Sequence, residues 1–176
     1  MVDAPVLTII TPVSVDHQQF LGETLPEIAG EKAGIIKRLV PSVVGPQQEA
    51  GMDVIESVAT HHHAPLLAYG QQWHVSAEAG RMVYQDERGL LDLPRPNLPG
   101  DHQIMNAGAA LAALRQLGIA ADACEAAVTQ AQWPARMQQL SAGPLAGKAP
   151  EGELWLDGGH NPAAGQALAA ALAAMP

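Results

Sequence analysis

The sequence predicts an α/β protein in which a parallel sheet with flanking helices is joined to a small antiparallel sheet. Across residues 6–69, short aliphatic runs alternate with segments of helical periodicity, the pattern of parallel strands linked by helices. Residues 73–93 alternate with a period of two and have turn signals at Ala79-Gly80 and Glu87-Arg88-Gly89, which predicts antiparallel strands. A last strand and helix, residues 154–175, form a further βα unit for which the sequence offers no partner strand.

Three strands and two helices make up the predicted parallel unit. The first strand, residues 6–10, is aliphatic throughout and is expected to be buried on both faces. Thr24 and Glu27 have capping-box spacing, so a helix is expected from Pro26 to Lys37. The other elements are strands at 42–45 and 65–69 and a helix at 47–63. Side chains just after the first strand are expected at the ligand-binding edge of the sheet.

Helices dominate the next part of the chain. A linker with Pro94, Pro96 and Pro99 precedes a long helix, residues 101–116, which Asp101 is expected to cap, and Asp122 is expected to cap a second helix. Glycine, proline and small residues make 141–152 a predicted linker. The predicted division is therefore a main domain at 1–140, a linker at 141–152 and the start of a second domain at 153–176.

Composition argues against several classes of protein. Acidic residues outnumber basic ones by 18 to 9, for a net charge of −9, and the basic residues are scattered, so nucleic acid is not an expected partner. No apolar run approaches the roughly 20 residues that a membrane span needs, and no signal peptide is evident. The single cysteine, Cys124, is expected to be a small packed side chain. These features predict a cytoplasmic protein.

Lys32 is the first candidate for chemistry. On the predicted helix it lies four residues from Ile28 and from Ile36, which places it in an apolar stripe. Burial would favour the neutral amine, which can react with carbon dioxide to give a carbamate whose oxygens suit magnesium. The alternative is a lysine that extends past the isoleucines into solvent.

Other polar residues gather at the first turns of the long helix. His102 and Asn106 are four residues apart and Gln103 and Asn106 three, so their side chains share one side of the helix. Such a set can bind the edge of a purine, or can simply be capping and solvated surface. His17 lies in the loop after the first strand, where a doubly wound sheet binds ligands.

A strand-to-helix turn is the third candidate. Asp157 ends the predicted last strand and is followed by two glycines and His160, an arrangement that can bind ribose hydroxyls or can be a glycine-bearing loop with incidental polar residues. Arg136, beside a rigid proline, could bind phosphate or lie on the surface. Residues 143–149 do not have phosphate-loop spacing, and three consecutive histidines, 61–63, point about 100° apart and cannot converge on one ion.

In chain order, five blocks resemble the folylpolyglutamate synthase/dihydrofolate synthase family, relatives of the Mur ligases. The blocks are Val15-Asp16-His17 with Phe20-Leu21-Gly22, residues 28–36, His102-Gln103 with Asn106, Pro134 with Arg136, and Asp157 to Pro162. The resemblance covers nearly the whole chain, although the middle hairpin region matches only in pattern. It implies a Mur-ligase-type central domain followed by the first βα unit of a Rossmann-like domain. Gly159 stands where the family often has alanine, and Ala135 where it often has glycine.

The resemblance also implies roles and a reaction. It makes His17 and Lys32 catalytic magnesium ligands, Lys32 as a carbamate, and it implies an ATP site formed by Gln103, Asn106, Arg136, Asp157 and His160. ATP would phosphorylate the carboxylate of a folate or of dihydropteroate, and the amine of L-glutamate would attack the acyl phosphate. The alternatives are a noncatalytic nucleotide-binding or partner-binding module of this fold, and a Mur-type ligase of peptidoglycan precursors.

The same resemblance predicts an incomplete enzyme. The family's phosphate loop and its acidic magnesium ligand have no counterpart in these residues, so the chain is expected to be a fragment, inactive alone and with an unmodified Lys32. The full-length enzyme is expected to be a monomer. Because no partner strand is predicted for residues 154–156, the segment after them is expected to be poorly anchored and the chain to self-associate through it.

Overall fold

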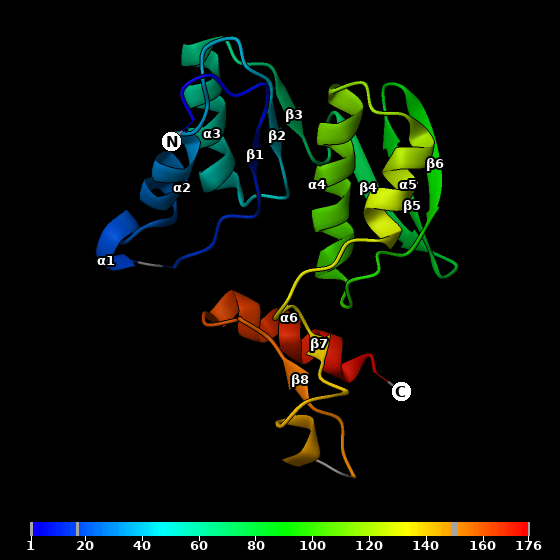
Figure 1. The fold of residues 1–176 in the computed structure, drawn as a ribbon. Helices are drawn as coiled ribbons and strands as arrows, with labels where there is room; N and C mark the ends of the chain where they lie inside the picture. The colour runs from blue at the N-terminus through cyan, green and yellow to red at the C-terminus, as the bar shows by residue number, and fades with distance from the viewer. Residues whose placement is uncertain (1, 17, 149–150, 176) are drawn as a thin grey trace.

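The computed structural model describes residues 2–16, 18–148 and 151–175 (Figure 1). It confirms the predicted parallel sheet, whose strands lie in the order β1 (Thr8–Ile10), β2 (Ser42–Val44) and β3 (Leu66–Ala68). Helices α2 (Leu25–Ala33) and α3 (Glu49–His62) cover one face of this sheet. The carboxyl ends of the strands therefore meet along one edge, where the chain continues into the loops that carry candidate site residues.

The burial of β1 differs from the prediction. Ile10 packs into the core formed with α2 and α3, but Ile9 is 39% exposed and Val6 is 75% exposed. The expectation that this strand is buried on both faces is therefore wrong. The long helix on the second face, α4 (His102–Gln116), packs chiefly against β2 and the antiparallel strands, which leaves the outer side of β1 open.

The antiparallel sheet is confirmed, with the predicted turns. Its strands are β4 (Trp73–Glu78), β5 (Arg81–Asp86) and β6 (Gly89–Pro94), paired in that order. The first turn has both central residues in the left-handed region, Ala79 at φ 48° and Gly80 at φ 78°, as a tight two-residue hairpin requires. Helix α4 lies between the two sheets, and α5 (Ala121–Thr129) packs beside β6 (Figure 1).

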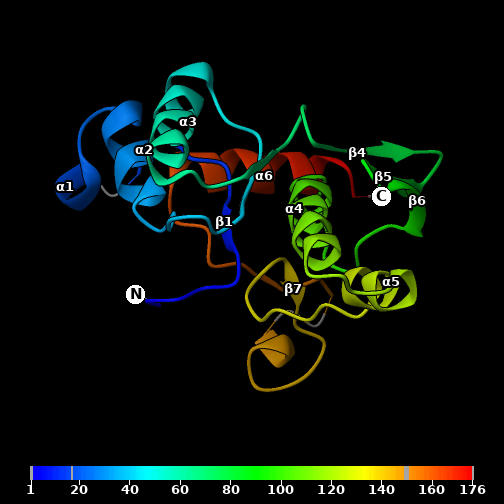
Figure 2. The same ribbon diagram turned by 90° about the horizontal axis from the view of Figure 1, so that it is seen from above.

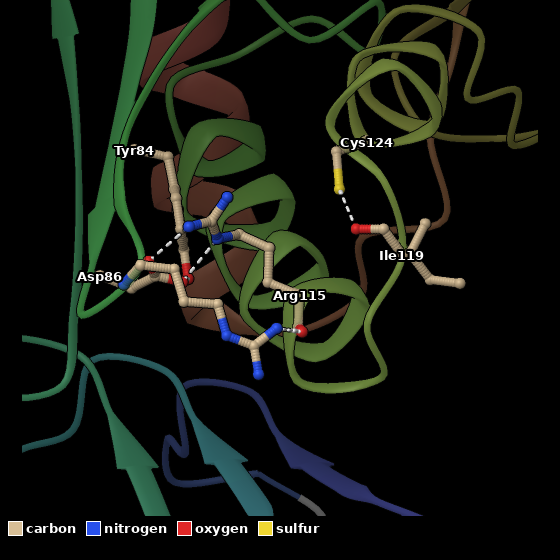
Figure 3. A network of polar contacts seen from close by, with 6 residues as sticks. Tyr84, Asp86, Arg115, Ile119 and Cys124 are labelled. Carbon is tan, nitrogen blue, oxygen red and sulfur yellow. Dashed lines mark hydrogen bonds and ion pairs between the residues drawn. The ribbon is translucent and has the colours of Figure 1, made fainter.

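A buried polar network joins β5 to α4 (Figure 3). Arg115 on α4 donates to both carboxylate oxygens of Asp86, at 2.6 and 2.8 Å, and the Tyr84 hydroxyl donates to Asp86 at 3.3 Å. Burial is the largest influence and acts to raise the pKa of Asp86, but the hydrogen bonds and charge of Arg115, together with hydrogen bonds from the Arg88 backbone and Tyr84, hold this pKa below its ordinary value. Cys124 is buried nearby, as predicted, and burial raises the pKa of its thiol.

Three helix ends differ from the sequence prediction. Helix α2 ends at Ala33 rather than at Lys37, because the chain turns at Gly34. The Asp101 carboxylate pairs with Arg95 and makes no capping bond to α4. The N-cap of α5 is Ala120, so Asp122 lies inside its first turn. The capping box at the start of α2 is confirmed, with both Thr24 and Glu27 bonds present.

The C-terminal part contains a strand pair that was not predicted. Strand β7 (Gln138–Gln139) pairs antiparallel with β8 (Trp155–Leu156), and α6 (Pro162–Ala173) follows. The segment between the two strands includes the short 3-10 helix η1 (Ala146–Lys148). The expectation that the last strand has no partner is wrong, because a two-residue glutamine strand carries no apolar signal. In the parts of the chain that the structure describes, no helix is long and apolar enough to cross a bilayer.

Candidate functional site

Two neighbouring clefts lie near the carboxyl end of β1 and the start of α6. The first, here called the β1 cleft, has a volume of about 400 Å³. Its polar lining comes from three segments: Thr11, Ser14 and Asp16 after β1, Glu31 and Lys32 on α2, and Asn161 before α6. The structure thus places Lys32 in a cleft at the sheet edge, where a doubly wound fold binds ligands.

Lys32 is exposed in this cleft, so of the two alternatives the structure favours the lysine that extends past the isoleucines into solvent. Ile28 and Ile36 are both 1% exposed, but they belong to different segments, since α2 ends at Ala33 and Ile36 follows the turn. The helical wheel that placed Lys32 between them assumed a helix up to Lys37.

The second cleft, here called the α6 cleft, has a volume of about 220 Å³. It brings together three of the residues predicted to bind ATP: Arg136 and, from a turn later in the sequence, Asp157 and His160. His102 lines the same cleft, so it is separated from Gln103 and Asn106, its predicted companions. The cleft therefore joins a guanidinium, a carboxylate and two imidazoles around the start of one helix.

The Asp157 carboxylate organises the turn that forms the α6 cleft. One oxygen accepts the backbone N–H of Met137 at 2.8 Å, and the other accepts that of Gly159 at 2.6 Å. The backbone N–H of Gly158 donates to the Ala135 carbonyl at 2.9 Å. Each carboxylate oxygen retains a second lone pair, so Asp157 can still accept a hydrogen bond from a ligand hydroxyl.

Arg136 is presented by a strained loop. The residues on both sides of it, Ala135 at φ 55° and Met137 at φ 46°, are non-glycine residues in the left-handed region. A side-chain carbon added at Gly158 would lie 3.0 Å from the Arg136 guanidinium, so glycine there lets the arginine approach the turn. Strain of this kind is typical of residues held in place for a function, and here it positions an exposed guanidinium at the α6 cleft.

Gln103 and Asn106 lie at a third, apolar pocket of about 170 Å³, here called the α4 pocket. The Asn106 amide donates to the Gln103 side-chain oxygen at 2.9 Å, and Gln103 is only 6% exposed. The rest of the lining is mainly apolar, including Pro96, Leu98, Leu111 and Val128. Amide groups beside an apolar pocket suit a planar heterocycle that has both donors and acceptors.

His17 lies outside the described residues, so its predicted role stays a prediction. Within the described ranges, no group of three or more His, Cys, Asp or Glu side chains could hold a metal ion. The β1 cleft nevertheless offers carboxylate oxygens from Asp16 and Glu31, and such hard donors fit the chemistry of magnesium.

Asn161 is the site residue that sequence reasoning missed. Its Oδ1 accepts the backbone N–H of Ala164 at 2.8 Å and so caps α6, while its Nδ2 donates to Asp16 at 2.6 Å. It lines both the β1 cleft and the α6 cleft. An asparagine just before Pro162 is a recognisable N-cap signal, but nothing in the sequence pairs it with Asp16.

The fold and these clefts define an α/β protein with clefts at strand ends and at a helix start. No family model matches the chain. It is 33% identical over 168 residues to the dihydrofolate synthase/folylpolyglutamate synthase of Bacillus subtilis. The aligned region covers 89% of the chain and 37% of that protein. The Escherichia coli enzyme of the same description is 32% identical over 179 residues, covering 100% of the chain and 39% of that protein.

Solved structures agree with the sequence relatives. E. coli FolC in complex with DHPP and ADP has a TM-score of 0.82 at 32% identity, over 97% of this chain and 38% of that one. An FPGS-AMPPCP-folate complex has a TM-score of 0.81 at 28% identity, over 98% of this chain and 43% of that one. The chain belongs to the folylpolyglutamate synthase/dihydrofolate synthase family of the Mur ligase superfamily, and it spans less than half the length of these relatives.

Proposed function

We propose that the complete protein is an ATP-dependent ligase that joins L-glutamate to a folate or to dihydropteroate through an acyl phosphate. The observation that carries the proposal is the α6 cleft, in which Arg136, Asp157 and His160 converge beside the cleft that holds Lys32. A guanidinium can bind phosphate oxygens bidentately, and a carboxylate with a lone pair to spare can accept a ribose hydroxyl. The structural relatives include one solved with ADP and another solved with AMPPCP.

Each candidate residue has a specific part in this proposal. Gln103 and Asn106 would bind the adenine edge at the α4 pocket, and Arg136 would bind phosphate. His160 and Asp157 would contact the nucleotide from the turn before α6. His17 and Lys32, the latter as a carbamate, would hold Mg²⁺, which when bound would neutralise charge on the transferring phosphoryl group.

The proposal predicts a specific requirement for two substrates. In the complete protein, sustained ADP formation should require both a pteroate or folate and L-glutamate, because without the amine the acyl phosphate is not consumed. ADP formation with a muramyl peptide substrate instead would identify a Mur-type ligase. Nucleotide binding without turnover on any of these substrates would identify a noncatalytic module.

A matched pair of arginine variants tests the α6 cleft itself. Arg136→Ala should weaken ATP binding to the complete protein about tenfold or more, because a charge-assisted contact to phosphate is lost. Arg81→Ala is the control, since Arg81 pairs with Asp92 on the antiparallel sheet, away from the cleft. Equal ATP affinity for the two variants, measured by titration calorimetry, would remove Arg136 from the proposed site.

A further inference from the structure

The Asp16–Asn161 hydrogen bond joins two parts of the chain that are 145 residues apart. Asp16 belongs to the loop after β1, and Asn161 is the N-cap of α6. The bond is 2.6 Å long and partly buried, and its acceptor is a carboxylate. A charge-assisted bond in such a setting is stronger than one between neutral groups.

Helix α6 has little other apolar anchoring. Among its described residues, Ala171 is the one that is buried, and Leu172 is 53% exposed. Figure 1 places α6 between the two sheets and the segment that contains β8 and the 3-10 helix, and Figures 1 and 2 show its start on the side of the loop after β1. Its far end approaches the start of α4, since a side-chain carbon added at Gly100 would lie 3.4 Å from the Ala171 methyl carbon. A helix so lightly packed depends on contacts at its ends for its position.

We propose that Asn161 is a positioning residue, which holds the start of α6 against Asp16 so that the β1 cleft and the α6 cleft form one continuous site. Its two amide atoms have separate roles: Oδ1 caps the helix, and Nδ2 donates to Asp16 in the loop after β1. When α6 moves away, both clefts lose a wall at once, because Asn161 lines both. Apparent affinity for a ligand that needs both walls then falls with the docked fraction, a consequence that rests on the proposed function.

The chemistry of the pair allows capping to be separated from positioning. Asn161→Asp keeps an equally good N-cap but sets a second carboxylate against Asp16, which loses the donor and adds repulsion. Asp16→Ala removes the acceptor and leaves Asn161 and its cap unchanged. The double variant Asp16→Asn with Asn161→Asp reverses the polarity of the bond. The amide at position 16 then donates to the carboxylate at position 161, which still caps α6.

Amide hydrogen exchange in the 176-residue chain is the direct measurement. Exchange of the α6 amides should be about tenfold faster in Asn161→Asp and in Asp16→Ala, because an undocked helix of this length is marginal in water. It should return to the wild-type rate in the double variant. Amides of α3, which pack against α2 in the core, should be unchanged in all variants and report that the body is folded.

The outcomes separate cleanly. Wild-type exchange in α6 of both single variants would overturn the proposal, and so would fast exchange that persists in the double variant. If Asn161→Asp also speeds exchange of the α3 amides, the body of that variant is no longer folded, and the exchange of α6 in Asp16→Ala is then the test of the proposal. The measurement needs no nucleotide, so failure to bind ATP would defeat the proposed function and leave this result standing.

Discussion

Arg115 donates two hydrogen bonds to Asp86, through Nε and one terminal nitrogen, and the two side chains are 12% and 11% exposed (Figure 3). The same carboxylate accepts the backbone N–H of Arg88 at 2.8 Å and the Tyr84 hydroxyl. One carboxylate therefore connects β5, the turn after it and the last turn of α4. The pair is the main polar link between the antiparallel sheet and that helix.

Loss of this carboxylate should be costly. Asp86→Ala leaves Arg115 buried without its partner, so we expect the free energy of unfolding to fall by about 3 kcal/mol. The matched control is Asp92→Ala, which breaks the Arg81–Asp92 pair, whose side chains are 48% and 55% exposed. That change should cost at most about 1 kcal/mol. Urea denaturation of both variants gives the comparison, and equal losses would contradict a special role for the buried pair.

Acidification should remove the stabilisation that the Asp86–Arg115 pair provides. The pKa of Asp86 is lowered in the folded chain, so its stabilising effect is fully present above the unfolded pKa of about 3.9 and is lost as the pH falls through the folded value. The difference in unfolding free energy between the wild type and Asp86→Ala should therefore be constant near neutral pH and shrink below about pH 4. Urea titrations from about pH 7 to about pH 3 test this. A difference that grows on acidification would show that the pKa shift has the opposite sign.

Gly108 should not tolerate a methyl group. It lies on α4 against β4, and a side-chain carbon there would be 2.7 Å from both Trp73 and Val75. Gly108→Ala should therefore cost about 1–3 kcal/mol through overpacking, despite the better helix propensity of alanine. Gly165→Ala on α6 is the control, because nothing lies within 4 Å of its added carbon. That change should raise the helical content slightly, and a loss of stability there would argue against the packing explanation.

Ala135 should gain from replacement by glycine. Its φ of 55° costs an alanine about 1–2 kcal/mol, and glycine avoids most of that cost. We expect Ala135→Gly to stabilise the chain by about 1 kcal/mol. Ala123→Gly in α5, where the backbone is helical, should instead destabilise it by about 1 kcal/mol. Thermal melting of the two variants measures both signs, and a destabilised Ala135→Gly would show that the strain is absent in solution.

The elements that sequence predicts well are those whose own residues determine them. The period-two alternation of residues 73–93 and the Thr24–Glu27 capping box are local signals, and both are confirmed. The β7–β8 pair was missed because pairing of Gln138 with Leu156 depends on a partner across the segment 141–152. The end of α2 was misplaced because apolar periodicity continues past Gly34, where the helix stops.

The same contrast between local signals and contacts of distant segments applies to the candidate site. The motif at Asp157 and His160 predicts a turn before a helix, and the structure has one. Its place beside Arg136 depends on a hydrogen bond from Met137 to Asp157, and its place beside Lys32 depends on Asn161 and Asp16. Such contacts between distant segments leave no pattern in a single sequence, which explains why sequence reasoning misses Asn161.

The two sheets differ in how far apart along the chain their strands lie, and this has a consequence for the order of folding. Asp86 pairs with Gly89 across a tight turn, whereas Thr8 pairs with Ser42 only after α1 (Gln18–Leu21) and α2 have been traversed. Closing a short loop costs less chain entropy, so the hairpins of the antiparallel sheet should form before the parallel sheet is assembled. Helix α6 reaches back to the loop after β1, so it can dock only on a finished sheet, and its docking should be the last step.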